Sequence, residues 1–422
     1  MTSSTQKNTP TTAALITLSL IPLMMVLGNS MIIPALPLIE KSLDISSFQV
    51  SLLITLFSIP AGIVIPVTGI LADRIGRKKV IFVSLLIYGL GGLLAGISAF
   101  WNNGSYPFLL GARILQGIGA AGTSPIAMVL ISDLYQKEER SKVLGINEAS
   151  NAFGKVLSPI LGSLLMLITW YTMFFVFPLL CIPVAIALWK VIKEPSAKQD
   201  PIPLKQYGTD IRKIFQRQGK WLIIAFLAGA ITLLTLFGVL FYLSDTLEKS
   251  HHIAGVKKGF ILAIPLSSLC IVSYWAGSHV KNKTSQMKKF ILIGLGIMAV
   301  FSAILPWVSQ IILLISVSFC LGIGAGLILP CLNTLITSAI GMQERGIITS
   351  LYGSVRFFGV AFGPPIFERL SSQPFLLYYG LTALFILIGI GAAVFIHRPQ
   401  RLRGKDGRSR LLIRKKKFQP SS

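Results

Sequence analysis

Residues 117–159 read GIGAAGTSPIAMVLISDLYQKEERSKVLGINEASNAFGKVLSP, and residues 322–364 read GIGAGLILPCLNTLITSAIGMQERGIITSLYGSVRFFGVAFGP. A constant offset of 205 residues superposes the two stretches without a gap and aligns identical Gly, Pro, Glu-Arg and Phe-Gly positions. The same offset places Ile59-Pro60 on Ile264-Pro265. The chain is therefore predicted to consist of two halves of the same fold, related as parallel repeats.

Apolar runs long enough to cross a bilayer recur through both halves. The chain of 422 residues is 53% hydrophobic and only 13% charged, whereas soluble domains have about 25% charged residues. A helix of about twenty apolar residues spans the hydrocarbon core. We therefore predict an all-α integral membrane protein with twelve transmembrane helices, six in each half, and a first helix that is retained. The predicted spans are 14–37, 48–71, 80–100, 105–131, 143–168, 171–191, 221–243, 258–277, 289–308, 310–338, 347–370 and 374–396.

The basic residues lie almost entirely on one side of the predicted membrane. Of 39 Lys and Arg, 31 fall in the termini and in the connections on their side, five in the other connections, and three inside spans. This asymmetry follows the positive-inside rule and predicts that both termini are cytoplasmic. The net charge of +24 then reflects topology, so we predict no nucleic-acid partner and a basic tail that is solvated or faces lipid headgroups. The predicted segments are a cytoplasmic N-terminus (1–13), a first six-helix half (14–192), a basic cytoplasmic linker (193–219), a second half (220–397) and a basic tail (398–422).

The sequence shows no pattern typical of a metal site, a cofactor site or an enzyme. The cysteines lie in apolar runs without paired spacing, which indicates packing rather than disulfides or metal ligation. His251-His252 stands in a polar loop without other ligands at a suitable spacing. Neither a phosphate-binding loop nor a catalytic triad pattern is present, so ATP-driven transport by this chain alone is not expected. The cysteines are Cys181, Cys270, Cys320 and Cys331.

Residues 69–79, GILADRIGRKK, form a tight predicted turn between two spans. Gly69 and Gly76 permit close approach and dihedral angles that other residues avoid. Asp73 can pair with a neighbouring arginine or face a helix N-terminus. The stretch resembles, residue for residue, the signature loop of the major facilitator superfamily. The resemblance covers essentially the whole chain, through the twelve spans, the duplicated halves and the basic central loop.

This resemblance implies a cytoplasmic latch between the two halves. The corresponding stretch of the second half, GSHVKNKTS from Gly277, has Ser278 in place of Asp73, so the latch is expected to be lopsided. Asp133, at the cytoplasmic end of the fourth span, is expected to pair with Arg140 or with the loop rather than to carry protons. The predicted latch residues are Gly69, Asp73, Arg74, Gly76, Arg77, Asp133 and Arg140.

The fourth span carries RILQGIGAAG from Arg113. In the superfamily that the chain resembles, an arginine followed by glutamine and small residues at this place implies proton-coupled transport. The alternative is a structural arginine that is hydrogen-bonded to backbone carbonyls.

The fifth span contains Gly154-x-x-x-Ser158-Pro159-x-x-Gly162, similar to the antiporter motif of the same superfamily. Small residues at a spacing of four let helices approach closely, and a proline bends the helix. The motif is associated with export, although Ser158 and Ser163 stand where it has glycine. Generic close packing is the alternative. The predicted packing residues are Gly154, Ser158, Pro159 and Gly162, with Gly359, Gly363 and Pro364 in the eleventh span.

Charged residues inside the fifth span need a protein or aqueous environment, because a charge at the bilayer centre costs about 2.5–3.5 kcal/mol on insertion scales. On a helical wheel Asn147, Glu148, Asn151, Lys155 and Ser158 share one face. The repeat aligns Asn151 with Arg356, so both halves are expected to face one central cavity, in contact with substrate or as charge pairs within the fold. The predicted cavity residues are Asn29, Asn147, Asn151, Lys155, Tyr352, Arg356 and Phe357.

The intramembrane charges are Arg113, Lys155 and Arg356 against Glu148 alone. This excess of cations favours neutral or anionic amphipathic substrates over organic cations. Glu148 is the candidate proton carrier, with Arg113 as the second coupling residue. Two alternatives stay open for Glu148, a structural pair with Arg113 or Lys155 and a solvated glutamate near a helix end.

We therefore predict a proton-coupled secondary transporter in a bacterial cell membrane, an antiporter that exports hydrophobic or amphipathic small molecules as multidrug efflux proteins do. A proton symporter that imports an organic anion and a lipid flippase are the alternatives, and a sensor built on a transporter fold is a more distant one. The predicted partners are the small-molecule substrate, protons and the lipid bilayer, and the chain is expected to act as a monomer without cofactors.

Overall fold

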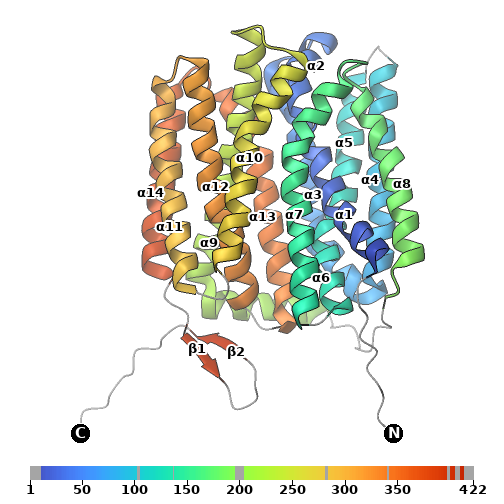
Figure 1. The fold of residues 1–422 in the computed structure, drawn as a ribbon, viewed down its shortest axis with the longest axis vertical. Helices are drawn as coiled ribbons and strands as arrows, with labels where there is room; N and C mark the ends of the chain where they lie inside the picture. Colours follow the sequence, from blue (N-terminus) through green and yellow to red (C-terminus); the bar gives the residue numbers. More distant parts are fainter. Residues whose placement is uncertain are drawn as a thin grey trace.

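The structure is a computed structural model that describes residues 11–101, 105–135, 137–194, 204–280, 284–339, 342–396, 400–403 and 409–412. Helices dominate it (Figure 1), and the strands β1 (Gln400–Arg403) and β2 (Ser409–Leu412) pair antiparallel, with Gln400 opposite Leu412. The helices are α1 (Thr12–Ser30), η1 (Ile33–Ala35), α2 (Leu36–Leu43), α3 (Ser47–Ile75), α4 (Arg77–Phe100), α5 (Ser105–Ala121), α6 (Ser124–Leu134), α7 (Lys137–Leu165), α8 (Thr172–Val191), α9 (Leu204–Lys249), α10 (Gly255–Val280), α11 (Thr284–Ile304), η2 (Leu305–Trp307), α12 (Ile311–Ala339), α13 (Met342–Arg369) and α14 (Pro374–Phe395).

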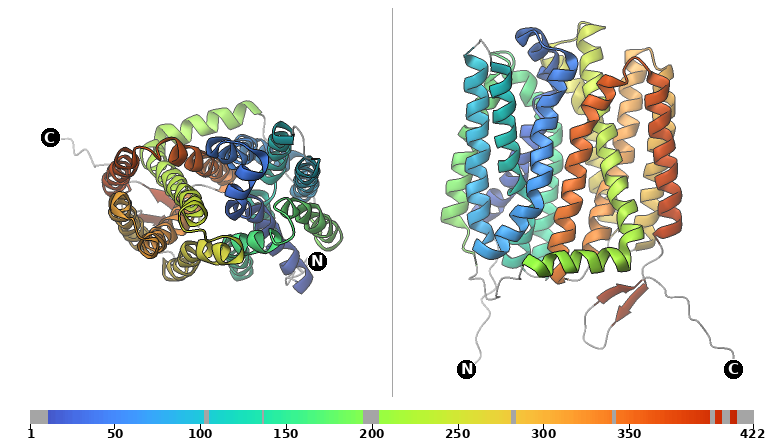
Figure 2. Two further views of the ribbon diagram at one scale, coloured as in Figure 1. Left: turned by 90° about the horizontal axis from the view of Figure 1, so that it is seen from above. Right: turned by 180° about the vertical axis from the view of Figure 1, so that it is seen from behind.

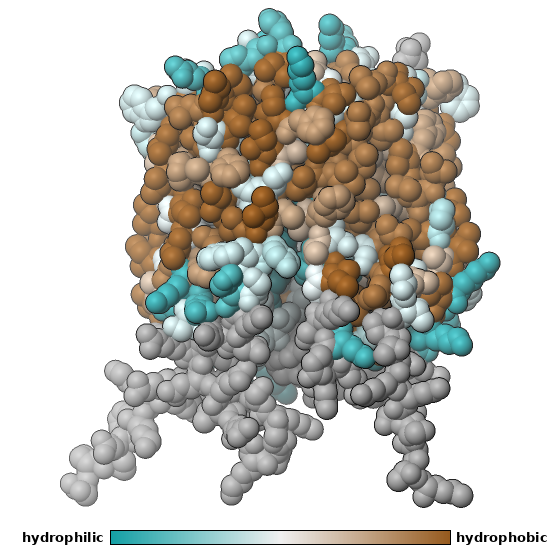
Figure 3. Space-filling view, in the orientation of Figure 1, coloured by the Kyte–Doolittle hydropathy of each residue, from teal (hydrophilic) through white to brown (hydrophobic). Residues whose placement is uncertain are grey.

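The predicted twelve-helix membrane fold is confirmed. Within the described residues, 11 segments are long and apolar enough to cross a bilayer, and two of them join shorter helices, α1 with α2 and α5 with α6. The remaining predicted span is α7, which has a polar face and packs among the other helices. Figure 3 shows apolar residues covering the middle of one face, with hydrophilic residues toward its two ends.

The helices form two halves that repeat the same contacts. In the first half α1 packs on α7 and α8, α3 packs on α5, and α4 packs on α5 and α8. In the second half α9 packs on α13 and α14, α10 packs on α12, and α11 packs on α12 and α14. Two helix pairs make the most extensive contacts between the halves, α3 with α13 and α7 with α10, and the repeat exchanges these two pairs. Smaller contacts, such as that of α2 with α9, also join the halves. We call this interface between the halves the seam.

Glycines explain how closely the helices approach, and they do so in equivalent places. A Cβ atom on Gly117 would fall against the carbonyl oxygen of Phe57, and one on Gly322 against that of Pro265. Both contacts join the fourth helix of a half to its second helix, so the sequence repeat is also a repeat of packing. Close backbone approach of this kind favours association of helices in lipid, where van der Waals packing replaces the hydrophobic effect.

Helix α9 begins inside the predicted linker, although residues 195–203 of that linker lie outside the described residues. We call the end of the bundle where α1 begins and α14 ends the terminal end, and we call the other end of the bundle the opposite end. The first part of α9 runs across the terminal end before the helix turns into the bundle (Figure 2). The predicted basic tail lies outside the described residues apart from β1 and β2.

Candidate functional site

Charged side chains from both halves lie within electrostatic range of one another at the seam. Lys155 of α7 interacts electrostatically with Arg356 of α13, with Glu148 and with Cys270 of α10. Tyr352, one turn from Arg356 on α13, interacts with Arg356 and Glu148. We call Glu148, Lys155, Tyr352 and Arg356 the seam cluster. The cluster therefore contains three of the predicted cavity residues, Lys155, Tyr352 and Arg356, and the candidate proton carrier, Glu148.

Arg356 and Tyr352 are held by the second half and keep polar atoms available. Arg356 Nη1 donates a hydrogen bond of 3.4 Å to Asn333 Oδ1, and its Cζ lies 5.4 Å from the centre of the Tyr352 ring. Tyr352 is buried and its ring centre is 5.6 Å from that of Phe226. Among the described residues, neither Arg356 Nε nor Tyr352 Oη has a hydrogen-bond partner. A buried polar atom without a partner costs about 1–3 kcal/mol, so these two atoms carry an unsatisfied hydrogen-bonding capacity in this conformation.

Lys155 and Glu148 lie on the first-half side of the seam cluster. Lys155 is half-buried and Glu148 is exposed. Among the described residues Glu148 forms no ion pair, with either Lys155 or Arg113. Glu148 therefore makes no direct ion pair in the described part of the chain, and its role stays a prediction.

Arg113 is placed differently, in the interior of the first half. Its side chain is fully buried, and its Nε and Nη1 donate to the carbonyl oxygens of Leu53 (2.9 Å) and Gly28 (3.0 Å). Nη1 also donates to Gln116 Oε1 at 2.6 Å, and the guanidinium lies 4.5 Å from the Phe57 ring centre. These contacts match the alternative of a structural arginine that joins α5 to α1 and α3. A role of Arg113 in proton coupling stays a prediction.

Two predicted cavity residues are bonded within the first half. Asn147 is buried and its Nδ2 donates to the carbonyl oxygen of Leu18 at 3.0 Å. Asn29 is buried and its Oδ1 accepts a 3.4 Å hydrogen bond from Ser58 Oγ. The two amides thus hold α1 against α7 and α3. Asn151 on α7 and Phe357 on α13 are half-buried, and their contact with a substrate stays a prediction.

The predicted latch loop is tied to its own half. Arg77 forms ion pairs with Asp73, at 3.4 Å, and with Asp133 of α6. The backbone N–H groups of Arg77 and Lys78 donate to the carboxylate of Glu194 at 2.7 and 3.1 Å, so this acid caps the N-terminus of α4.

Gly76, with φ +101°, adopts the left-handed turn that this connection requires. Gly69 faces the other half, since a Cβ there would lie 3.1 Å from Ser350 Oγ of α13. A latch between the halves stays a prediction, with Arg74 exposed and the side chain of Arg140 outside the described residues.

Both copies of the glycine motif lie at equivalent helix contacts. A Cβ on Gly162 would meet the Met31 carbonyl oxygen of the first half, and a Cβ on Gly359 would meet the Ala230 carbonyl oxygen of the second. Gly154 faces Leu23, and Gly363 faces the backbone of α9. Ser158 Oγ donates to the Gly154 carbonyl at 2.6 Å, and Pro159 and Pro364 lie inside their helices. The motif residues therefore pack α7 on α1 and α13 on α9.

Sequence reasoning missed the polar contacts that join the halves near the opposite end. Lys249 Nζ donates to Glu40 Oε1 at 3.0 Å, across the two halves, and pairs with Asp245 at 2.8 Å. Ser244 Oγ donates to the carbonyl oxygen of Ile33 at 2.9 Å, also across the halves. The only signal in the sequence was that basic residues are scarce on this side, and scarcity does not reveal a partner.

Both the sequence and the fold of the chain are similar to those of known proteins. Residues 18–364 match the model of the Major Facilitator Superfamily. The chain is 41% identical over 384 residues to the bacillibactin exporter of Bacillus subtilis (strain 168), covering 90% of this chain and 95% of that protein. It is 26% identical over 383 residues to multidrug resistance protein 1 of the same organism, covering 89% and 94%.

Two solved structures share the fold at low sequence identity. One is the crystal structure of a bacterial homologue of the human lysosomal transporter Spinster in an inward-facing and unoccupied conformation. It has a TM-score of 0.67 at 18% identity over 90% of this chain and 95% of that chain. The other is the human organic anion transporter MFSD10, with a TM-score of 0.69 at 16% identity over 90% and 99%.

Proposed function

Because this chain belongs to the major facilitator superfamily, we propose that it is an efflux transporter whose substrates are bacillibactin or small amphipathic anions of similar character. Membership of the family makes the chain a multi-pass membrane transporter and not an enzyme. Efflux is supported by the bacillibactin exporter and the multidrug resistance proteins among its relatives. The 41% identity to the bacillibactin exporter extends over nearly all of both chains.

The observation that carries the substrate class is the position of Lys155 and Arg356. The two cations interact electrostatically from α7 and α13, which belong to different halves. Like charges within electrostatic range of each other in a membrane repel, and a bound anion between them would relieve this repulsion. An anion at the seam cluster would bind both halves at once, and Arg356 Nε and Tyr352 Oη would supply hydrogen bonds to it.

Export of an anion also fits the electrical field of a bacterial membrane. We propose that both termini are cytoplasmic, as the distribution of Lys and Arg supports. The free energy of a single negative charge falls by about 2.3 kcal/mol per 100 mV of membrane potential when it leaves a cell with a negative interior. The membrane potential can therefore contribute to the export of anions. We propose that the chain acts as a monomer.

Proton coupling is a further part of the proposal, and Glu148 is its candidate carrier. In an antiport cycle Glu148 would be deprotonated when substrate leaves and protonated while the empty carrier returns. The cations of the seam cluster also favour a specific alternative, cotransport of a proton with the anion. A bound anion stabilises a protonated carboxyl nearby, and cotransport of proton and anion would follow if both stayed bound through the same conformational change.

Proteoliposomes with a trapped pH-sensitive dye test the proposal. Bacillibactin and a panel of anionic, neutral and cationic amphiphiles are added under an imposed proton gradient, with transport of each compound measured directly. Transport of anions that is weakened by Lys155→Gln and by Arg356→Gln but unchanged by Lys257→Gln, at an exposed lysine of the opposite end, supports the assignment. Proton movement against the substrate indicates antiport, and movement with it indicates symport. Transport of cations alone would overturn the substrate class.

A further inference from the structure

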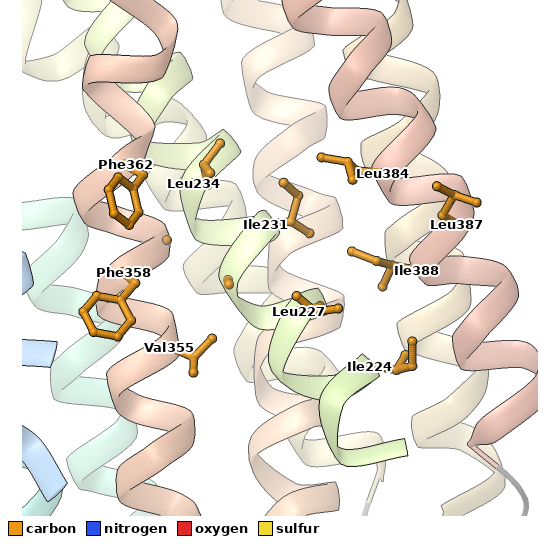
Figure 4. A pocket seen from close by; sticks show the side chains of 12 residues that line it. Ile224, Leu227, Ile231, Leu234, Val355, Phe358, Phe362, Leu384, Leu387 and Ile388 are labelled. Carbon is orange, nitrogen blue, oxygen red and sulfur yellow. The ribbon is translucent and has the colours of Figure 1, made fainter. Parts of the chain in front are cut away.

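An apolar cavity opens on the surface of the second half. It has a volume of about 460 Å³ and lies between α9, α13 and α14 (Figure 4). Ile224, Leu227 and Ile231 of α9 line one wall, Phe362 of α13 another and Leu387 of α14 the third. Leu227, Phe362 and Leu387 are 46%, 46% and 63% exposed. The cavity is therefore a groove that opens toward the lipid.

Basic side chains adjoin this groove at the terminal end. Lys220 precedes Ile224 by one helical turn, so the two lie on the same face of α9. Its Nζ lies 5.8 Å from the centre of the Phe395 ring, where α14 ends. The groove and Lys220 therefore form one continuous surface between α9 and α14.

The part of α9 that crosses the terminal end continues this basic surface. Residues 211–220 contain four basic residues and no acidic one. Arg212, Lys213, Arg217 and Lys220 are all exposed, and among the described residues none of them forms an ion pair. The other face of this stretch is apolar, with Ile214 buried and the Phe215 ring centre 6.2 Å from that of Phe226. A basic amphipathic stretch at the edge of a transmembrane bundle lies at headgroup depth.

We propose that this surface binds one anionic phospholipid of the leaflet at the terminal end. The phosphate lies against Lys220, with Arg217 and Lys213 beside it, and one acyl chain fills the groove between α9, α13 and α14. Charge complementarity selects the headgroup, because Lys and Arg near the membrane surface attract anionic lipids. Lipid tails are as apolar as the groove lining, so the groove contributes packing and position rather than a hydrophobic gain.

The bound lipid would touch α13, the helix that carries Arg356. Val355 lines the groove and directly precedes Arg356, a member of the seam cluster. A lipid in the groove therefore packs against α13 at the level of Arg356. The proposal itself does not depend on what the transporter exports, since it requires only that the chain spans a bilayer.

Native mass spectrometry of the purified full-length protein tests the proposal, with phosphatidylglycerol or phosphatidylcholine of equal chain length added to the detergent solution. The wild-type protein is expected to bind phosphatidylglycerol about tenfold more tightly. The triple variant Lys213→Gln, Arg217→Gln, Lys220→Gln should lose this preference. Leu227→Trp, which fills the groove, should weaken binding of both lipids while the headgroup preference is kept. Soluble glycerol phosphate should not compete, because it has no acyl chain.

The matched control replaces three exposed basic residues at the terminal end of the first half, Lys79, Lys190 and Lys193, by glutamine. This control should keep the preference for phosphatidylglycerol. Equal binding of the two lipids by the wild-type protein would overturn the proposal, as would an equal loss in the control triple variant. An unaltered melting temperature of each variant in detergent excludes misfolding as the cause of weaker lipid binding. If the triple variant does not fold, the single variant Lys220→Gln takes its place.

Discussion

Lys249 and Glu40 are 209 residues apart in the sequence, yet Lys249 Nζ and Glu40 Oε1 lie 3.0 Å apart. Lys249 belongs to α9 of the second half and Glu40 to α2 of the first, so their ion pair joins the halves near the opposite end. Ser47 strengthens it, because its hydroxyl donates to Glu40 at 2.7 Å. Alternating access by rocking of the halves must break this pair whenever the seam opens at that end.

Glu40→Gln should make opening at the opposite end easier. A partly exposed ion pair contributes about 0–1 kcal/mol, so the rate at which an impermeant thiol reagent added at that end labels Cys270 should rise about two- to fivefold. Cys270 interacts with Lys155 and thus reports on the seam, in a chain whose other cysteines are replaced by alanine. Lys257→Gln, exposed on α10, is the control. Unchanged labelling of Cys270 would show that the pair does not govern opening.

Lys155→Gln and Arg356→Gln should each weaken transport of anionic substrates. A hydrogen bond to a charged group contributes about 1.5–3 kcal/mol, so the KM for an anionic substrate is expected to rise about tenfold or more. Lys155→Arg, which keeps the positive charge, should retain most of the affinity. Initial rates of uptake into inverted vesicles measure the effect. A neutral analogue that responds as strongly as the anion would count against direct charge recognition.

Glu148→Gln should separate transport from the proton gradient. The amide has the shape of the carboxyl group but cannot exchange a proton, so an imposed gradient should no longer drive accumulation, while exchange of substrate at equal pH continues. Glu139→Gln, on the same helix and half-buried, is the matched control. If the variant still accumulates substrate with the same dependence on pH, Glu148 is not the carrier.

Arg113→Lys should destabilise the protein without altering the ratio of protons to substrate. Arg113 donates to two backbone carbonyls and to Gln116 from a fully buried position, and lysine cannot reproduce this fork. A loss of roughly 2–4 kcal/mol is expected, visible as a lower melting temperature in detergent. The reverse result, normal stability with an altered ratio, would assign Arg113 to coupling.

Gly162→Ala and Gly359→Ala should each loosen the packing of a half. The new methyl groups would meet the carbonyl oxygens of Met31 and Ala230, and overpacking of this kind costs about 1–3 kcal/mol. Gly296→Ala in α11 is the control, since a Cβ there has nothing within 4 Å and alanine favours a helix. Melting temperatures should fall for the first two variants and stay equal or rise for the control. Tolerance of alanine at both motif positions would contradict the packing role.

The sequence repeat predicted the scaffold and the interface to which both α7 and α13 belong, because both depend on periodicity. Apolar runs locate the spans, and the offset that aligns Asn151 with Arg356 places α7 and α13 at the same interface. Asn147 shows the limit of this reasoning. It shares a helical face with Lys155, yet that face is broad enough to reach α1 at one edge, where Asn147 donates to Leu18, and the seam at the other. A wheel drawn from one helix does not say where its neighbours lie.

Contacts between distant residues could not be predicted from local patterns. Glu194 follows α8 in the sequence but caps α4 through the backbone of Arg77 and Lys78. Such an acid differs in no local feature from a solvated linker residue. The helical start of α9 was hidden for a similar reason, because its basic composition indicated a linker while its apolar positions, Ile214 and Phe215, acquire their meaning only against the bundle.

The scaffold is duplicated, but the charges on it are not. The repeat places Val360 where the first half has Lys155, and Asn151 where the second half has Arg356. Each half carries one of the two cations, and the equivalent position in the other half is neutral. A descendant of this protein can therefore acquire a new ligand preference by changing residues in one copy, while the glycine contacts repeated in both copies continue to hold the fold.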